Sequence, residues 1–94
     1  MLSEYKFTTA NFNVNLSAYS DYNALFITFF SEKGSGMRSS VSNATVLVST
    51  SYDADGSGNR PINEFVVTNI NANSVFTSSV SESGAKHLCI IGVK

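Results

Sequence analysis

Asn23-Ala-Leu-Phe-Ile-Thr-Phe-Phe-Ser31 is the stretch that decides the fold, because residues 24–30 hold six apolar residues and one Thr without a break. Periodicity alone does not separate such a run from a buried helix, so its length and composition decide. The run is short and rich in aromatic and β-branched residues, and the turn signal Glu32-Lys-Gly-Ser-Gly36 follows it. We therefore predict a central β-strand that is covered on both faces.

The segments around this run alternate between apolar and polar residues, as half-buried strands do. The clearest alternation lies in residues 12–18, and the turn residues 19–23 then predict a hairpin between this segment and the central run. The residues of this segment that share one face are Phe12, Val14, Leu16 and Ala18. Further strands are expected over residues 5–9, 41–50, 62–70, 74–80 and 86–93.

Seven strand candidates, with turn signals about every 8–12 residues and no helical period, predict an all-β antiparallel β-sandwich or small barrel. An exposed Gly- and Ser-rich loop is expected over residues 31–40, and a longer break over residues 52–61, with Pro61 at a strand entrance. We find no internal repeat or linker, so we predict one domain over residues 1–94. The lone Cys89 cannot form an internal disulfide and is expected to be a small buried hydrophobe.

The composition excludes several classes of function. Charged residues make up 14% of the chain, against about 25% in a typical domain, and Ser, Thr and Asn take their place. The six Lys and Arg residues are scattered singly, so no basic stripe is available for nucleic acid. No apolar run approaches the roughly 18–20 residues that span a membrane. Residues 1–8 do not resemble a secretory signal, so we expect a cytoplasmic product unless a leader was removed.

Residues 53–64 contain the one motif that could carry chemistry. Asp53-Ala-Asp-Gly-Ser-Gly-Asn-Arg-Pro-Ile-Asn-Glu64 fits the calcium-loop pattern D-x-[DN]-x-[DNS]-G-x5-E. In that pattern oxygens at positions 1, 3 and 5 surround the ion, glycine at position 6 allows the sharp turn, and a carboxylate at position 12 closes the site. Calcium is therefore the one cofactor that the sequence suggests, and its candidate ligands are Asp53, Asp55, Ser57 and Glu64.

These twelve residues resemble the EF-hand loop, and that resemblance would imply a calcium site between two helices. The flanking segments have strand patterns instead, and Arg60 and Pro61 stand at positions 8 and 9, so we expect no EF-hand. Two interpretations stay open. One is a calcium site in a β-hairpin loop, with Glu64 carried away along a strand. The other is turn chemistry alone, in which Gly supplies positive φ and Asp and Asn form Asx-turns.

No catalytic constellation stands out in the chain. His87 and Cys89 are two apart in a predicted strand and so share a face, but no third orienting group or oxyanion hole accompanies them. Most of the seven carboxylates lie in predicted turns or near the N-terminus, where solubility explains them. We therefore predict that the protein is not an enzyme. Four tyrosines near strand ends suit a sugar-binding platform, sandwich corners or interface anchors equally: Tyr5, Tyr19, Tyr22 and Tyr52.

In overall character the chain resembles the small all-β structural proteins of tailed bacteriophages that decorate heads or build tails and fibres. The resemblance is compositional and covers the whole chain. It implies a non-enzymatic virion protein, made in the host cytoplasm and exposed outside after lysis, whose partners are further copies of itself and other virion proteins. The alternative is a calcium-assisted carbohydrate-binding or adhesion module that uses residues 53–64 and Tyr52.

Overall fold

The computed structural model describes residues 2–32, 37–53, 61–80 and 84–94, which form eight β-strands and one short 3-10 helix. The elements in chain order are β1 (Leu2–Thr8), β2 (Asn13–Asn15), η1 (Ser17–Tyr19), β3 (Ala24–Ser31), β4 (Arg38–Ser42), β5 (Thr45–Asp53), β6 (Pro61–Thr68), β7 (Val75–Ser79) and β8 (Lys86–Val93). A five-stranded sheet has the order β1-β8-β3-β6-β5, and a three-stranded sheet has the order β2-β7-β4. The strand pairs are antiparallel. The predicted all-β sandwich is confirmed, with one strand more than expected in the described residues.

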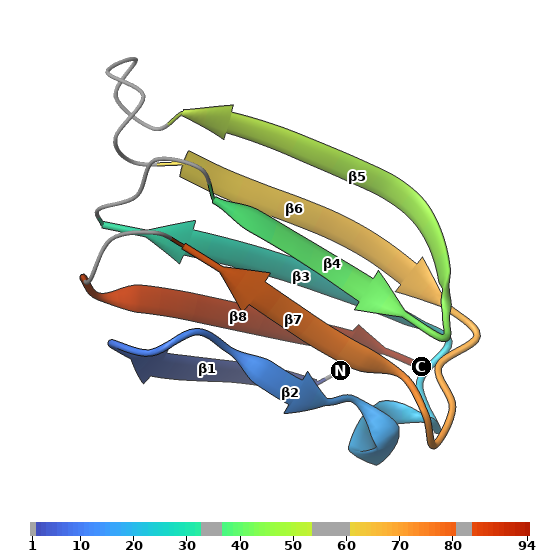
Figure 1. Cartoon of the computed structure of the whole chain (residues 1–94). Helices are drawn as coiled ribbons and strands as arrows, with labels where there is room; N and C mark the ends of the chain where they lie inside the picture. The colour runs from blue at the N-terminus through green and yellow to red at the C-terminus, as the bar shows by residue number, and fades with distance from the viewer. Residues whose placement is uncertain (1, 33–36, 54–60, 81–83) are drawn as a thin grey trace.

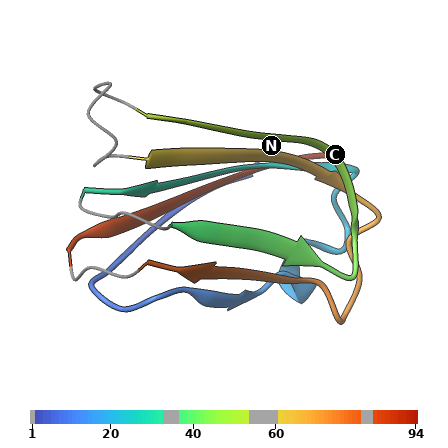
Figure 2. The same ribbon diagram turned by 45° about the horizontal axis from the view of Figure 1, so that its top comes forward.

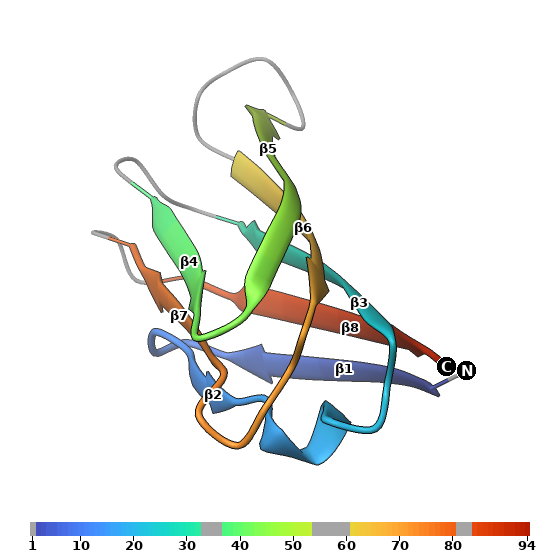
Figure 3. The same cartoon turned by 90° about the vertical axis from the view of Figure 1, so that its right-hand side faces the viewer.

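The two sheets lie face to face as two layers (Figures 1 and 2). In the five-stranded sheet β3 is the middle strand, between β8 and β6, as expected for the longest apolar run. The sandwich is not closed on every side. Figure 3 shows β4 and β5, the edge strands of the two sheets, joined at one end and diverging toward the other.

The core lies between the two sheets and consists of apolar side chains from alternate positions of the strands. In β3 these are Leu25, Ile27 and Phe29, each at most 1% exposed. The Phe29 ring meets the ring of Phe12 at 6.0 Å and that of Phe76 at 5.7 Å, both edge to face. Edge-to-face pairs stabilise a core beyond the area they bury. Burying each such side chain contributes about 1.5–3 kcal/mol, so this cluster holds the two layers together.

The predicted hairpin between residues 12–18 and the central run is wrong. β2 pairs with β7 in the three-stranded sheet, whereas β3 pairs with β6 and β8 in the other. Between them, η1 carries the chain from one layer to the other, and Ala18 is exposed there. Alternation predicts which side of a strand is buried, but it does not say which strand becomes the hydrogen-bonding partner.

The expected strand over residues 41–50 is also wrong, because the chain changes sheets in the middle of it. β4 ends at Ser42 and β5 begins at Thr45. Between them Asn43 has a φ of 58°, a left-handed conformation that Asn adopts more readily than most residues. The exposed loop predicted over residues 31–40 is likewise shorter, since Arg38 already belongs to β4 and Met37 packs against the core.

A second crossover, from β6 to β7, lies beside this corner, and side-chain amides tie the two together. The Asn43 amide donates to the Asn73 carbonyl at 2.9 Å. The Asn43 carbonyl accepts from the Asn71 amide at 2.9 Å and from the Ser74 hydroxyl at 2.6 Å. The Asn-rich composition therefore serves the sheet-to-sheet corners as well as the surface.

The prediction that β3 is covered on both faces is wrong for the isolated chain. Its inward residues are buried, but Phe26, which points away from the second sheet, is 45% exposed. Cys89 of the neighbouring strand β8 is also only partly buried rather than a core residue. The outward side of the central strands is thus apolar and has no covering layer among the described residues.

Candidate protein interface

The outward side of the five-stranded sheet, called the outer face below, carries two apolar rows that run across the strands. The strand register places Ile91, Phe26, Val66 and Val48 side by side in the first row, from β8 to β5. The second row, in the same strand order, is His87, Phe30, Ile62 and Tyr52. Between them lies a more polar row made of Cys89, Thr28, Glu64 and Thr50. The outer face thus holds one carboxylate among the side chains of these three rows.

Large apolar side chains of the outer face remain in contact with solvent. Phe26 is 45% exposed, Val48 47% and Tyr52 51%, and Tyr5 of β1 reaches 63%. A depression of about 240 Å³ lies between β3, β6 and β5, with Phe26, Val48 and Val66 in its wall. Contiguous exposed apolar patches of this kind are uncommon on monomers and mark interaction sites.

The outward side of the three-stranded sheet has the opposite character. Its exposed positions are mostly polar: Asn13, Asn15, Arg38, Ser40, Ser42, Thr77 and Ser79. The hydroxyls of Ser40 and Thr77 are hydrogen-bonded across the strands at 3.1 Å. The outward side of the three-stranded sheet is therefore suited to contact with water, and the outer face of the five-stranded sheet is suited to contact with another protein.

Aromatic rings surround His87 at one end of the outer face. Its ring stacks on Tyr5 at 5.7 Å and on Phe30 at 5.6 Å. Its Nδ1 atom shares a hydrogen bond with the Tyr5 hydroxyl, and its Nε2 atom lies 3.6 Å from the Glu32 carboxylate. His87 and Cys89 share a face, as the sequence predicts. Both ring nitrogens of His87 nevertheless contact side chains other than Cys89. His87 is therefore a member of the second row and packs between aromatic rings.

Glu64 and Tyr52 are diagonal neighbours on β6 and β5, on the outer face. The hydrogen bond with the Glu64 carboxylate raises the pKa of the Tyr52 phenol. Glu64 thus has a partner within its own chain, at the rim of the apolar rows.

The residues predicted to bind calcium are only partly within the described chain. Asp55 and Ser57 lie outside the described residues. β5 ends at Asp53, which pairs with Pro61, and Glu64 follows three residues later on β6, opposite Thr50. Among the described residues, no three His, Cys, Asp or Glu side chains gather as a metal site would require. The calcium loop stays a prediction.

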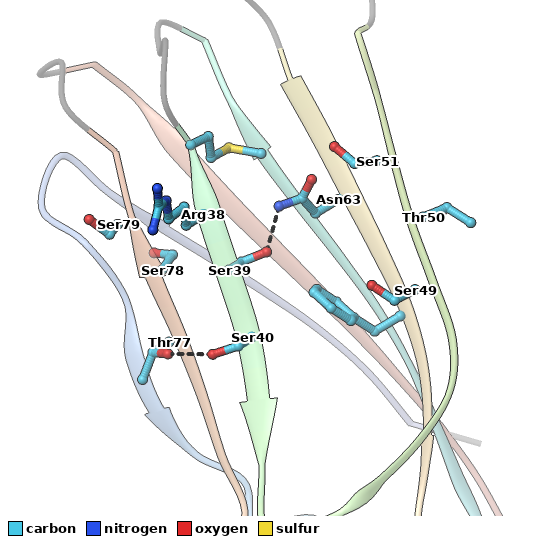
Figure 4. Close-up of a pocket in the computed structure, with 12 residues that line it drawn as sticks. Arg38, Ser39, Ser40, Ser49, Thr50, Ser51, Asn63, Thr77, Ser78 and Ser79 are labelled. Atoms are coloured by element: carbon cyan, nitrogen blue, oxygen red, sulfur yellow. Dashed lines mark hydrogen bonds between the residues drawn. The ribbon is translucent and has the colours of Figure 1, made fainter.

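A groove of about 610 Å³ runs along the opening between β4 and the β5–β6 pair (Figure 4). Hydroxyl groups from three strands line it, among them Ser39, Ser49 and Ser51, and the Asn63 amide donates to Ser39 Oγ at 2.6 Å. Figure 4 shows Thr50 pointing away from Ser49 and Ser51, toward the other side of β5. Tyr52 has the same orientation by alternation, so the structure does not bring this tyrosine to the hydroxyl-lined groove.

Comparison of the chain with protein-family models, with curated proteins and with solved structures returned no match. In the part of the chain that the structure describes, no helix has the length and apolar character needed to cross a membrane.

Sequence reasoning missed the outer face as a site, although its signal was present. A seven-residue apolar run predicts burial on both sides of β3, and the alternate positions of β8 add Ile91 and Val93 to the same face. A two-layer sandwich covers each sheet on one side only. Combining these two expectations would have identified a face in need of a partner.

Proposed function

We propose that this chain is a non-enzymatic structural protein of a virion, a capsid decoration or tail component, which acts by associating with further copies of itself and with other virion proteins. One observation carries the proposal, namely the apolar rows of the outer face, which no other part of the described chain covers. Covering them removes apolar surface from water, and each half-exposed side chain contributes on the order of 1 kcal/mol when it is buried.

The size of the outer face supports a stable contact. Five strands spaced about 4.8 Å apart and about eight residues long cover roughly 600 Å² of planar area. Because side chains roughen this plane, the accessible area is larger and approaches the roughly 800 Å² per partner of a standard protein interface. The face also carries few charges, so copies of the chain meet with little like-charge repulsion when they crowd together.

The rest of the surface suits the proposed setting. It is polar but weakly charged, with 14% charged residues in the whole chain, and the single cysteine makes no demand on the redox state of the compartment. Such a protein can fold in the host cytoplasm, join an assembly there, and remain soluble outside after lysis.

The proposal predicts that a charge in the middle of the outer face weakens assembly. Phe26→Asp places a carboxylate in the first apolar row, where a partner would have to bury it, so we expect at least about a tenfold higher dissociation constant. Thr77→Asp is the matched control, since Thr77 is exposed on the polar outward side of the three-stranded sheet, in its middle strand β7. Sedimentation velocity over a range of concentrations measures both variants against the unmodified chain.

The virion setting has its own test. Large assemblies purified from the source of the chain by gradient sedimentation should contain it in many copies, detected by mass spectrometry. A stable monomer at high concentration that also fails to bind virion components would contradict the proposal. Calorimetric titration with calcium, followed by a glycan panel, tests the alternative of a carbohydrate-binding module, and heat in both titrations would favour that alternative.

A further inference from the structure

The edge of β5 carries fewer of the features that usually prevent strand pairing than the other sheet edges do. Edge strands are commonly protected by shortness, by charged residues, by proline or by a β-bulge. β2 has three residues, β4 begins with Arg38, and β1 carries Glu4 and Lys6, whose side chains are 3.6 Å apart. β5 has nine residues and contains no Lys, Arg or Pro, and its one charged residue, Asp53, is the last of the strand. Every residue from Thr45 to Tyr52 is exposed.

The one irregularity of β5 limits where a further strand can pair. The register between β5 and β6 shifts between Val46 and Val48, so Leu47 forms a bulge and is 61% exposed. Bulges interrupt a ladder and bend the strand. Residues 48–53 follow without a shift, and residues 48–52, which precede the charged Asp53, form the uncharged regular part of the edge.

This regular segment is complementary to itself. Directly opposed residues of an antiparallel pair lie on the same face of the sheet. When two copies of residues 48–52 run antiparallel, the register that uses the whole segment sets Thr50 against Thr50 and Val48 against Tyr52. Thr–Thr and aromatic–β-branched pairs are both favourable across strands. The remaining pair joins Ser49 with Ser51, so no like charges meet.

We infer that two copies of this chain pair edge to edge through β5, antiparallel about Thr50, and so join their five-stranded sheets into one sheet of ten strands. The inference rests on the proposed function and names the first contact of the assembly. In this arrangement the apolar rows of the two outer faces become continuous, because Val48 and Tyr52 end the rows at β5. The pair of chains then presents an apolar surface of twice the size, which a further copy of the chain or another virion protein can bind.

A disulfide trap tests this register. In a Cys89→Ala background, Thr50→Cys places the only cysteine of each copy opposite its equivalent, at a Cα separation of about 4.5–5.5 Å, which is within the range that a disulfide spans. We expect most of the protein to become a disulfide-linked dimer on mild oxidation, as read on non-reducing gels and by intact mass. Ser3→Cys in the same background is the matched control, because Ser3 is exposed on β1, the opposite edge of the same sheet. It should give several-fold less dimer.

A charge variant provides a second measurement without cysteines. Thr50→Lys sets two ammonium groups against each other on the two-fold axis, so the dissociation constant should rise at least tenfold, whereas Thr50→Val should leave it within about threefold. Equal crosslinking of Thr50→Cys and Ser3→Cys, or unchanged assembly of Thr50→Lys, would overturn the inference. If Phe26→Asp still weakens assembly in that case, the proposed function survives without this contact. If the unmodified chain stays monomeric and binds no virion component, both fail.

Discussion

At the scale of single residues, Lys86 has the least expected environment in the molecule. Its side chain is only 2% exposed, at the end of the inner side of β8 and opposite Ser31 in the register. Its Nζ atom donates to the carbonyls of Thr9 and Gly84, both at 3.1 Å. A buried ammonium group requires such acceptors, since burial without hydrogen bonds costs several kcal/mol. Lys86 therefore closes one end of the sandwich by joining segments that flank β1 and β8.

Replacing Lys86 by methionine should lower the free energy of unfolding by about 1–3 kcal/mol. Methionine retains the long apolar stem but leaves the two carbonyls without this donor. Chemical denaturation monitored by circular dichroism measures the change. Lys94→Met is the control, because Lys94 is exposed at the end of the chain, and it should stay within about 0.5 kcal/mol of the unmodified protein. Equal stability of both variants would show that the Lys86 contacts contribute nothing.

At the scale of elements, the two crossovers between the sheets depend on asparagine for two separate reasons. Asn43 and Asn69 have φ values of 58° and 57°, which most side chains resist. Their amides also bridge neighbouring segments, since Asn43 donates to the Asn73 carbonyl and Asn69 donates to Thr45 Oγ1 at 2.8 Å. Asparagine suits both positions because it adopts the positive φ and its side-chain amide donates the hydrogen bond.

Two substitutions at position 43 separate these contributions. Asn43→Val introduces a β-branched residue at positive φ and removes the amide, so we expect a loss of about 2–3 kcal/mol. Asn43→Gly keeps the conformation accessible and removes only the hydrogen bond, so the loss should be about 1 kcal/mol. Thermal and urea unfolding measure both. Similar losses for the two variants would mean that backbone conformation is not the cause.

At the scale of the whole molecule, two tyrosines connect stability with alkaline pH. Tyr19 is buried in the core at 3% exposure, and burial together with its hydrogen bond to Glu4 raises the pKa of its phenol well above 10. The hydrogen bond with Glu64 raises the pKa of Tyr52 in the same direction. The folded state therefore retains protons that the unfolded chain releases near its ordinary tyrosine pKa of about 10.

Stability should consequently be constant toward neutral pH and fall as the pH rises above about 10, where the unfolded chain binds fewer protons than the folded one. Tyr19→Phe removes the larger of the two shifts, so the decline should become shallower even though the variant starts from a lower stability at neutral pH. Urea midpoints measured from pH 7 to 11 test this. An unchanged slope for Tyr19→Phe would show that burial of this phenol is not responsible.

The assignment of strands was largely predictable because it depends on local patterns. The run over residues 24–30, the apolar residues over 86–93 and Pro61 at the start of β6 each indicated their element. The corner at Asn43 was missed because Val41 and Thr45 continue a β-branched composition across it. The candidate interface was missed because it combines side chains from β8, β3, β6 and β5, which only the register brings together.

By itself, the sequence determined that this chain is made of strands, which residues in most of them are apolar, and that its middle strand is apolar on both sides. Only the tertiary structure decided that β2 pairs with β7, that Glu64 lies beside Tyr52, and that large apolar side chains on one face of the five-stranded sheet stay exposed in the described part of the chain. The physical reason is the distance along the chain between the residues that interact. Side-chain alternation is a property of neighbouring residues, whereas pairing, register and coverage result from contacts between segments far apart in the chain.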